Sequence, residues 1–194
     1  MSADFEKICD FVHELEKLKL VARKIKPKGM SRYENTAEHS WQVAMLAMSL
    51  LPYAQEELDG ATAVKMLLLH DVVEIDTGDK FAYAADHLDT ENETVAAERI
   101  FGLLPETLAA EMLATWLAFE TGDTPESRFA KGIDRLIPVL QNVRNEGQSW
   151  VEHGITQTQI LAKNSGVKNV SAELWDFVQV KVQDLVDRGL IAAS

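Results

Sequence analysis

The sequence is poor in cysteine and has no long apolar run. Cys9 is the only cysteine among 194 residues, which excludes an internal disulfide and favours a reducing compartment. No stretch approaches the roughly 18 consecutive apolar residues of a membrane-spanning helix. The first residues, Met-Ser-Ala-Asp-Phe-Glu, contain two acids and no apolar signal segment. We therefore expect a cytoplasmic protein with no membrane partner.

Basic residues are also scarce, since 19 Lys and Arg stand against 31 Asp and Glu and the formal net charge is −12. This balance argues against binding to a nucleic-acid polymer, which needs a basic surface. Seven of the basic residues nevertheless lie between Lys17 and Arg32, in a segment without any acid. Two interpretations stay open: a local site for a small anionic ligand, or a solvated basic helix end that suits the helix dipole.

Apolar residues recur at the spacing of an amphipathic helix along most of the chain. The expected helices cover about residues 8–21, 36–51, 61–75, 93–104, 106–120, 125–143, 151–163 and 171–188. The second and third are apolar nearly all round, which predicts a central position. Residues 80–92 show no clear period and are expected to form a loop.

No alternating strand pattern of useful length and no repeat is present, so the expected class is all-α. We expect one helical domain over residues 1–194, with a core at about 10–145 and additional helices at about 151–188. The apolar residues of the last helix, Leu174 to Val186, either cover the core or form a dimer interface.

Four residues that can bind metal lie on surfaces expected to face inward. His39 lies near the start of the second helix, His70 and Asp71 near the end of the third, and Asp134 beside the apolar stripe of the sixth. Burying an imidazole or a carboxylate costs several kcal/mol unless a partner compensates. Each residue alone is more often a hydrogen-bonded core residue, but four from three helices favour one shared cation.

Two imidazoles and two carboxylates leave open positions in an octahedral shell. Such a set suits Mn²⁺, Fe²⁺, Co²⁺, Ni²⁺ or Zn²⁺, and Mg²⁺ is retained as a further candidate. The thiolates that a closed structural zinc site favours are absent. We expect one divalent metal ion per subunit, of unassigned identity. His13, His87 and His153 have no companions at ligand spacing.

The pattern His39, His70-Asp71 and Asp134 resembles the signature of the HD-domain metal-dependent phosphohydrolases. The flanking sequences Glu-Asn-Thr-Ala-Glu-His-Ser-Trp, Leu-His-Asp-Val-Val-Glu and Phe-Ala-Lys-Gly-Ile-Asp are similar to the 5′-deoxynucleotidase branch. The resemblance covers about residues 10–145. It implies an HD-domain helical bundle with the metal site between central helices, and removal of phosphate from deoxyribonucleoside 5′-monophosphates.

The resemblance also implies roles for three further residues. Glu74 would act in catalysis, Arg23 would bind phosphate and Asp79 would lie near the sugar. The spacing of Glu74 agrees, because it lies about one helical turn after His70 and Asp71. Alternatively, Glu74 is an exposed helix-end acid and Asp79 an ordinary turn residue. Arg23 is followed by Lys-Ile-Lys, where relatives often carry an aromatic residue.

We consider two other functions as alternatives. The first is hydrolysis of another phosphomonoester, or of a nucleotide pyrophosphate or polyphosphate, which the missing aromatic residue after Arg23 motivates. The second is a non-catalytic nucleotide-sensing module. The resemblance implies a homodimer. The tryptophans are expected to serve in the core or at an interface rather than as base-stacking platforms; Trp41, two residues from His39, is the one exception for which stacking stays open.

Overall fold

The computed structural model describes residues 2–84 and 90–194, and within these ranges it contains helices, turns and one isolated β-bridge. The expected all-α class is therefore confirmed. Short 3₁₀ helices (η) adjoin several of the α-helices. The elements are α1 (Ala3–Leu15), η1 (Glu16–Leu20), α2 (Thr36–Leu50), η2 (Leu51–Tyr53), α3 (Gly60–Leu69), η3 (His70–Val73), α4 (Glu74–Thr77), α5 (Thr90–Phe101), α6 (Glu106–Thr121), α7 (Pro125–Arg144), α8 (Gln148–Glu152), α9 (Gln157–Asn164), η4 (Ser165–Asn169) and α10 (Ala172–Asp187).

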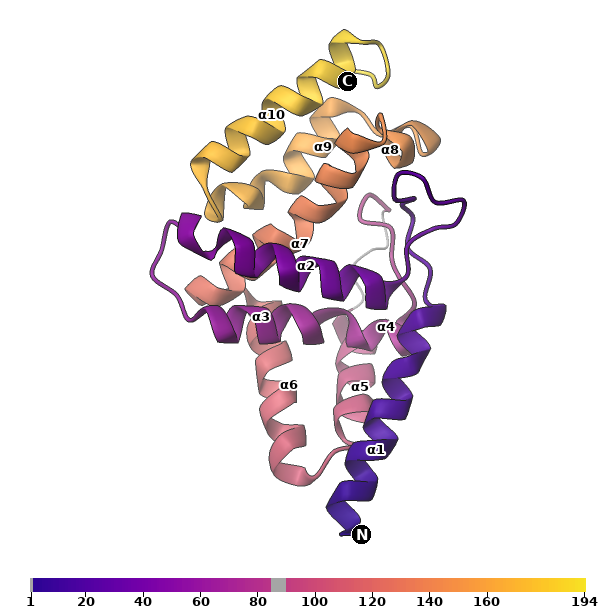
Figure 1. Ribbon diagram of the computed structural model, residues 1–194, viewed down its shortest axis with the longest axis vertical. Helices are drawn as coiled ribbons and strands as arrows, with labels where there is room; N and C mark the ends of the chain where they lie inside the picture. The colour runs from indigo at the N-terminus through magenta and orange to yellow at the C-terminus, as the bar shows by residue number, and fades with distance from the viewer. Residues whose placement is uncertain (1, 85–89) are drawn as a thin grey trace.

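The molecule is elongated, and its middle is formed by α2 and α3 lying side by side (Figure 1). Helices α1, α5 and α6 extend to one end, and α8, α9 and α10 lie at the other (Figure 1). Helix α7 contacts both α2 and α3 as well as the C-terminal helices. Within the described residues, no helix combines the length and apolar character needed to cross a membrane.

The first helix ends earlier than its periodicity predicts. Helix α1 stops at Leu15, and after η1 the chain becomes extended. Ala22 and Asn35 form an isolated antiparallel bridge. The Arg23 amide donates to the Glu34 carbonyl at 2.9 Å. The prediction of a helix to about residue 21 was therefore wrong. The apolar spacing persists to Val21, but the backbone passes through a 3₁₀ turn into an extended segment.

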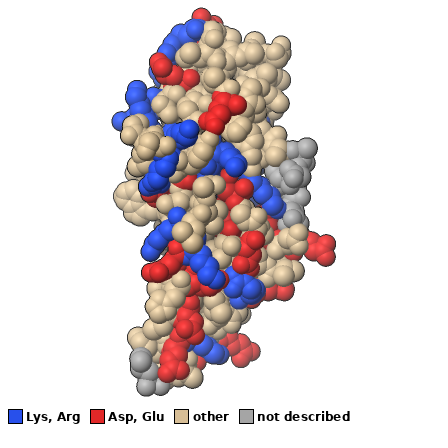
Figure 2. Space-filling model, turned by 90° about the vertical axis from the view of Figure 1, so that its right-hand side faces the viewer, with Lys and Arg blue, Asp and Glu red and all other residues tan. Residues whose placement is uncertain are grey.

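The basic segment consequently lies largely outside any helix. Arg23 and the basic residues up to Arg32 belong to the segment between η1 and α2. Figure 2 shows Lys and Arg side chains gathered over the middle and upper part of the face that carries this segment, with acidic side chains between them. The interpretation as a basic helix end is therefore wrong for most of the segment, since the chain from Val21 to Asn35 is not helical.

Helix α2 begins as the sequence predicts. The Asn35 side chain caps it by accepting from the Glu38 amide, and the Glu38 carboxylate returns a bond to the Asn35 amide. Its inner face packs against α3 and α7. Its outer face is open, because Trp41, Met45 and Met48 are 66%, 43% and 48% exposed. Helix α2 is thus central, as predicted, but only one side of it is covered.

The third helix changes geometry just before the candidate ligands. Helix α3 ends at Leu69, and η3 and α4 replace the single helix expected to reach residue 75. The carbonyl of His70 accepts a bond from the buried Trp116 indole at 3.0 Å. The Glu74 amide bonds to the carbonyls of Asp71 and Val72. This tighter turn sets the directions in which the side chains of His70, Asp71 and Glu74 point. The Trp116 indole, which donates to the His70 carbonyl, helps to hold the turn.

The predicted loop over residues 80–92 is only partly testable. Helix α5 begins at Thr90, three residues before the expected start. The expected loop over residues 80–92 falls partly outside the described residues, as does His87. Helix α7 begins at Pro125 with Thr124 as its cap, as predicted.

The C-terminal helices cover the second half of α7. Val178, Val182 and Leu185 of α10 are buried, and Trp150 of α8 lies in the same core cluster. The main apolar face of α10 therefore covers the core, which was the first of the two possibilities given for the last helix. Phe177 is 43% exposed and lies outside that buried face.

Candidate metal centre

The structure brings together His39, His70, Asp71 and Asp134. Nε2 of His39 lies 2.9 Å from Oδ1 of Asp134 and 3.7 Å from Oδ2 of Asp71. Nε2 of His70 lies 3.1 Å from Oδ2 of Asp71 and 3.4 Å from Oδ1 of Asp134. One ligand atom each from His39, His70 and Asp71 lie within 4.8 Å of one another. This His-His-Asp group could hold a divalent metal ion.

His70 is oriented as a metal-ligating histidine should be. Its Nδ1 lies 2.8 Å from the Leu67 carbonyl, so Nδ1 carries the proton and the Nε2 lone pair faces the site. Among the described residues, that buried Nε2 has no hydrogen-bond partner. A nitrogen lone pair and a carboxylate oxygen 3.1 Å apart repel each other unless a cation or a proton lies between them. The donor set therefore fits a divalent cation.

The same carboxylates control protonation of the two imidazoles. Burial alone would lower the pKa of His70, but Asp71 and Asp134 raise it well above its ordinary value. Burial and the charge of Arg23 lower the pKa of His39, although Asp134 opposes this shift. In the absence of metal, the two carboxylates therefore favour the protonated form of His70. A metal ion would have to displace that proton, so metal binding should strengthen as pH rises.

Arg23 lies beside the centre and is surrounded by acids. Its Nη1 donates to Oδ2 of Asp71 at 2.8 Å and lies 3.5 Å from Oδ1 of Asp79 and 3.8 Å from Oε1 of Glu74. Burial alone would raise the pKa of Asp71, but the charges of His70 and Arg23 outweigh it and lower the pKa to about 2. The Asp71 carboxylate is thus kept ionised and available as a ligand.

Glu74 and Asp79 are both turned toward this cluster. The Glu74 side chain is 12% exposed, and its Oε2 accepts from the Thr36 hydroxyl at 2.5 Å. The interpretation of Glu74 as an exposed helix-end acid is therefore wrong. Burial and the neighbouring Asp71 charge raise the pKa of Glu74 well above its ordinary value. Asp79 follows Gly78, whose φ is +71°, and its side chain is only 7% exposed.

Glu34 is a site residue that the sequence analysis did not single out. It is 2% exposed, and its Oε2 lies 3.7 Å from Nε of Arg23 and 3.8 Å from Nδ1 of His39. Its Oε1 accepts from the Gln141 amide at 2.7 Å. Burial raises the pKa of this carboxyl group. The available signal was its position immediately before the Asn35 cap of α2, the helix that carries His39.

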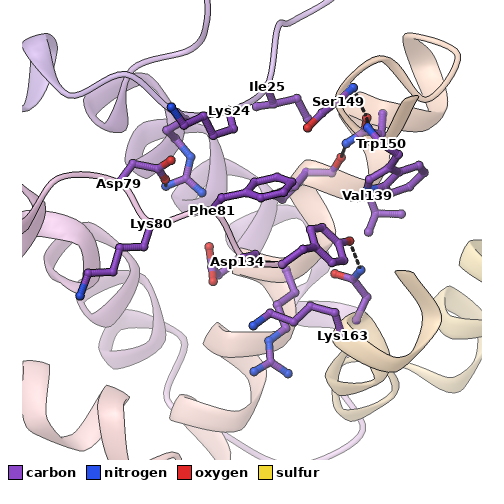
Figure 3. A pocket seen from close by; sticks show the side chains of 17 residues that line it. Lys24, Ile25, Asp79, Lys80, Phe81, Asp134, Val139, Ser149, Trp150 and Lys163 are labelled. Atoms are coloured by element: carbon purple, nitrogen blue, oxygen red, sulfur yellow. Dashed lines mark hydrogen bonds and ion pairs between the residues drawn. The ribbon is translucent and has the colours of Figure 1, made fainter. Parts of the chain in front are cut away.

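A cavity opens from the centre toward the C-terminal helices. Arg23, Asp79 and Asp134 line one part of it, and in Figure 3 the ring of Phe81 lies between Asp79 and the Trp150 wall. The sequence analysis assigned none of the remaining lining residues to a site. The aromatic ones are Phe81, Tyr83 and Trp150, and the basic ones include Lys24, Arg135 and Lys163.

The raised pKa of Glu74 predicts a pH-dependent effect on stability. Because the folded, metal-free protein retains this proton above the ordinary pKa of 4.5, stability is lost as pH rises from that value toward the folded pKa. Glu74→Gln should therefore raise the Tm of the metal-free protein at pH 8 more than at pH 4. Thermal unfolding with a chelator present measures this, with Glu173→Gln on the exposed surface of α10 as the control. An equal Tm difference at both pH values would contradict the assignment.

Comparison with known proteins agrees with this geometry. The HD domain family model matches residues 15–175 of the chain. The curated human (Homo sapiens) protein 5′-deoxynucleotidase HDDC2 is 30% identical over 118 residues, which are 59% of this chain and 55% of HDDC2. The mouse (Mus musculus) protein of the same name is 28% identical, over 59% of this chain and 57% of its own length. The chain thus spans about half the length of these curated relatives.

A solved structure extends the likeness over nearly the whole chain. The crystal structure of a predicted metal-dependent phosphohydrolase from Magnetospirillum magnetotacticum is 39% identical, with a TM-score of 0.92 over 98% of this chain and 96% of that one. The four predicted ligand positions all fall inside the segment matched by the family model. The chain therefore belongs to the HD-domain family.

Proposed function

We propose that this protein is a phosphomonoesterase that hydrolyses deoxyribonucleoside 5′-monophosphates to deoxynucleoside and phosphate. The observation that carries the proposal is the placement of Arg23 and Glu74 against the His-His-Asp group, with Arg23 and Asp134 also lining a cavity that has aromatic walls. The likeness to proteins named 5′-deoxynucleotidase over 59% of the chain supports it.

The proposed ligand set is His39, His70, Asp71 and Asp134. When bound, a divalent cation neutralises phosphate charge and makes water a better nucleophile. Asp71 and Asp134 supply negative charge to hold it, and the low pKa of both carboxyl groups keeps them ionised. The Leu67 carbonyl fixes the His70 tautomer so that Nε2 remains available.

Arg23 is proposed to bind the phosphate. Its guanidinium is held next to the centre by its bond to Asp71 and by the close approach of Asp79. A planar guanidinium donates paired hydrogen bonds to phosphate oxygens and stabilises charge that develops on them. The Arg23 backbone is anchored by the bond to Glu34, so the side chain is presented from an ordered segment.

Glu74 is proposed to move the proton. Its carboxyl group is buried, accepts from Thr36 and has a raised pKa, as is typical of general acids and bases in enzymes. It can take a proton from the attacking water or give one to the leaving 5′-oxygen. Asp79, buried near Arg23, is proposed to contact the sugar, where lack of room would disfavour a 2′-hydroxyl.

The proposal is tested by measuring phosphate release from a panel of ribo- and deoxynucleoside 5′-monophosphates, each with Mn²⁺, Co²⁺, Zn²⁺, Ni²⁺, Fe²⁺ or Mg²⁺. We expect release from deoxynucleotides in preference to ribonucleotides, and loss of release after chelation. Release of pyrophosphate from nucleoside triphosphates would favour the polyphosphate alternative instead. Binding of nucleotides with no turnover under any metal would favour a sensing module.

A homodimer is proposed as the assembly. Trp41, Met45 and Met48 on the outer face of α2 and Leu68 on α3 are all more than 40% exposed, and such apolar side chains are typical of interfaces. We further propose that residues 1–194 act as one domain, because α7 contributes buried residues to two of the core clusters. Sedimentation of the full chain tests the dimer.

A further inference from the structure

Lys163 of α9 and Arg135 of α7 are two basic residues that line the cavity beside Asp134. In the view of Figure 3, the Asp134 carboxylate lies between Asp79 and the Lys163 side chain. Burial lowers the pKa of Lys163, the charge of Arg135 lowers it further, and Asp134 opposes both effects. The two cations are therefore close enough to repel each other, at a place where solvent screening is reduced.

Neither cation has an acidic partner among residues 2–84 and 90–194, where no carboxylate oxygen lies within 4.0 Å of their side-chain nitrogens. Other basic residues of α7 are paired, since Arg128 lies 2.6 Å from Glu56 and Lys131 4.0 Å from Glu120. In a chain with 31 acidic and 19 basic residues, two cations that line one cavity with no acid within ion-pair distance in the described residues indicate a place for an anion.

The backbone of η4 holds Arg135 in this position. An ideal Cβ built on Gly166 would lie 2.8 Å from Nη1 of Arg135, closer than such atoms approach in practice. The guanidinium therefore packs directly on the glycine backbone. Gly166 does not have a positive φ, so an alanine there would displace the end of the Arg135 side chain without straining the backbone.

The candidate metal centre carries many acidic groups, so additional positive charge nearby would favour the binding of a phosphate. Glu34, Asp71, Glu74 and Asp79 all lie within 4.0 Å of the single Arg23 guanidinium. Asp134 adds a further carboxylate beside His39. These acids offset much of the charge of Arg23 and of a divalent cation, so further cations nearby would favour the binding of a phosphate dianion.

We propose that Lys163 and Arg135 form a second anion-binding subsite, which takes a phosphate group of the nucleotide substrate. This inference rests on the proposed function in treating the substrate as a nucleotide. Two sources of that phosphate share the same chemistry. The first is the 5′-phosphate that is removed, which Lys163 and Arg135 would bind together with Arg23. The second is another phosphate carried by the same nucleotide.

The test uses Lys163→Met in the full chain, with Lys168→Met as the matched control. Lys168 lies on the neighbouring η4, is exposed and does not line the cavity. Calorimetry measures the binding of inorganic phosphate to the metal-loaded protein. Kinetics give KM for deoxyadenosine 5′-monophosphate and for deoxyadenosine 3′,5′-bisphosphate. The loss of one charged hydrogen bond is expected to weaken binding by about 10- to 100-fold, and Lys168→Met should change nothing.

The pattern of the losses distinguishes the two sources. If the subsite binds the 5′-phosphate, Lys163→Met raises the Kd of inorganic phosphate and both KM values together. If it binds a second phosphate, only the KM of the bisphosphate rises. Arg135→Met should act in the same direction, and Gly166→Ala should give a smaller loss by displacing the guanidinium while keeping its charge.

Unchanged phosphate affinity and unchanged KM values in both Lys163→Met and Arg135→Met would overturn the inference. Failure of the proposed function gives a different result, because the wild-type protein would then release no phosphate from any deoxynucleotide while the calorimetric comparison could still be made. A wild-type protein that neither binds phosphate nor prefers either nucleotide would overturn the subsite as well.

Discussion

Replacing Asp134 with alanine is expected to abolish tight metal binding and metal-dependent phosphate release together. Oδ1 of Asp134 lies 2.9 Å from Nε2 of His39 and 3.4 Å from Nε2 of His70, so its removal deprives the proposed cation of a carboxylate that faces both imidazoles. Outer-shell partners of metals already contribute about 10- to 100-fold in affinity, and a direct ligand should contribute more.

Metal-induced stabilisation provides a measurement that does not depend on activity. A ligand that binds only the folded state at 100 times its Kd adds about 2.7 kcal/mol to the free energy of unfolding. The wild-type protein should therefore show a higher Tm with added Mn²⁺ or Co²⁺, and Asp134→Ala should not. Asp176→Ala, an exposed aspartate within α10, should keep the full rise. A variant at position 134 with full metal occupancy and normal turnover would remove this residue from the ligand set.

Replacing Glu74 with glutamine is expected to lower kcat by about 10²- to 10⁴-fold, the usual contribution of a positioned general acid or base. Glutamine keeps the size of the side chain and can still interact with the Thr36 hydroxyl, which lies 2.5 Å from Oε2 in the wild-type protein. What it loses is the ability to give or accept a proton. The metal-induced rise in Tm should therefore persist in this variant.

The pair of measurements separates a proton-transfer role from a structural one. Glu173→Gln, which changes an exposed acid of α10, serves as the control for both kcat and Tm. Thr36→Val should give a smaller loss, because it removes only the hydrogen bond to Glu74. If Glu74→Gln turns over substrate at the wild-type rate, Glu74 has no part in the chemistry, and if it loses the metal-induced Tm rise, its role is structural.

The helical framework and part of the site could be predicted from sequence because they depend on local pattern. Asn35 and Thr124 cap α2 and α7 as expected, since caps involve residues only three positions apart. His39, His70 and Asp71 could be identified because polar ligands in strongly apolar segments are costly to bury. The helical period failed at residues 16–20 and 70–73, where 3₁₀ turns replace the α-helical geometry.

Contacts between distant segments were decided by packing. Glu34 became a partner of His39 and Arg23 only because the bridge between Ala22 and Asn35 folds the basic segment onto the start of α2. Its position before the Asn35 cap places Glu34 near the start of α2, but the contact with Arg23 also requires the extended segment to fold back onto it.

By itself, the sequence determined an acidic, all-α chain with a two-histidine, two-aspartate pattern, since composition, period and spacing are properties of short windows. The tertiary structure alone decided that one guanidinium is shared among several carboxylates, that Glu74 is buried, and that Lys163 of α9 and Arg135 of α7 meet at one cavity. The physical reason is that charge pairing and desolvation depend on distances across helices, which are set by the packing of the whole bundle.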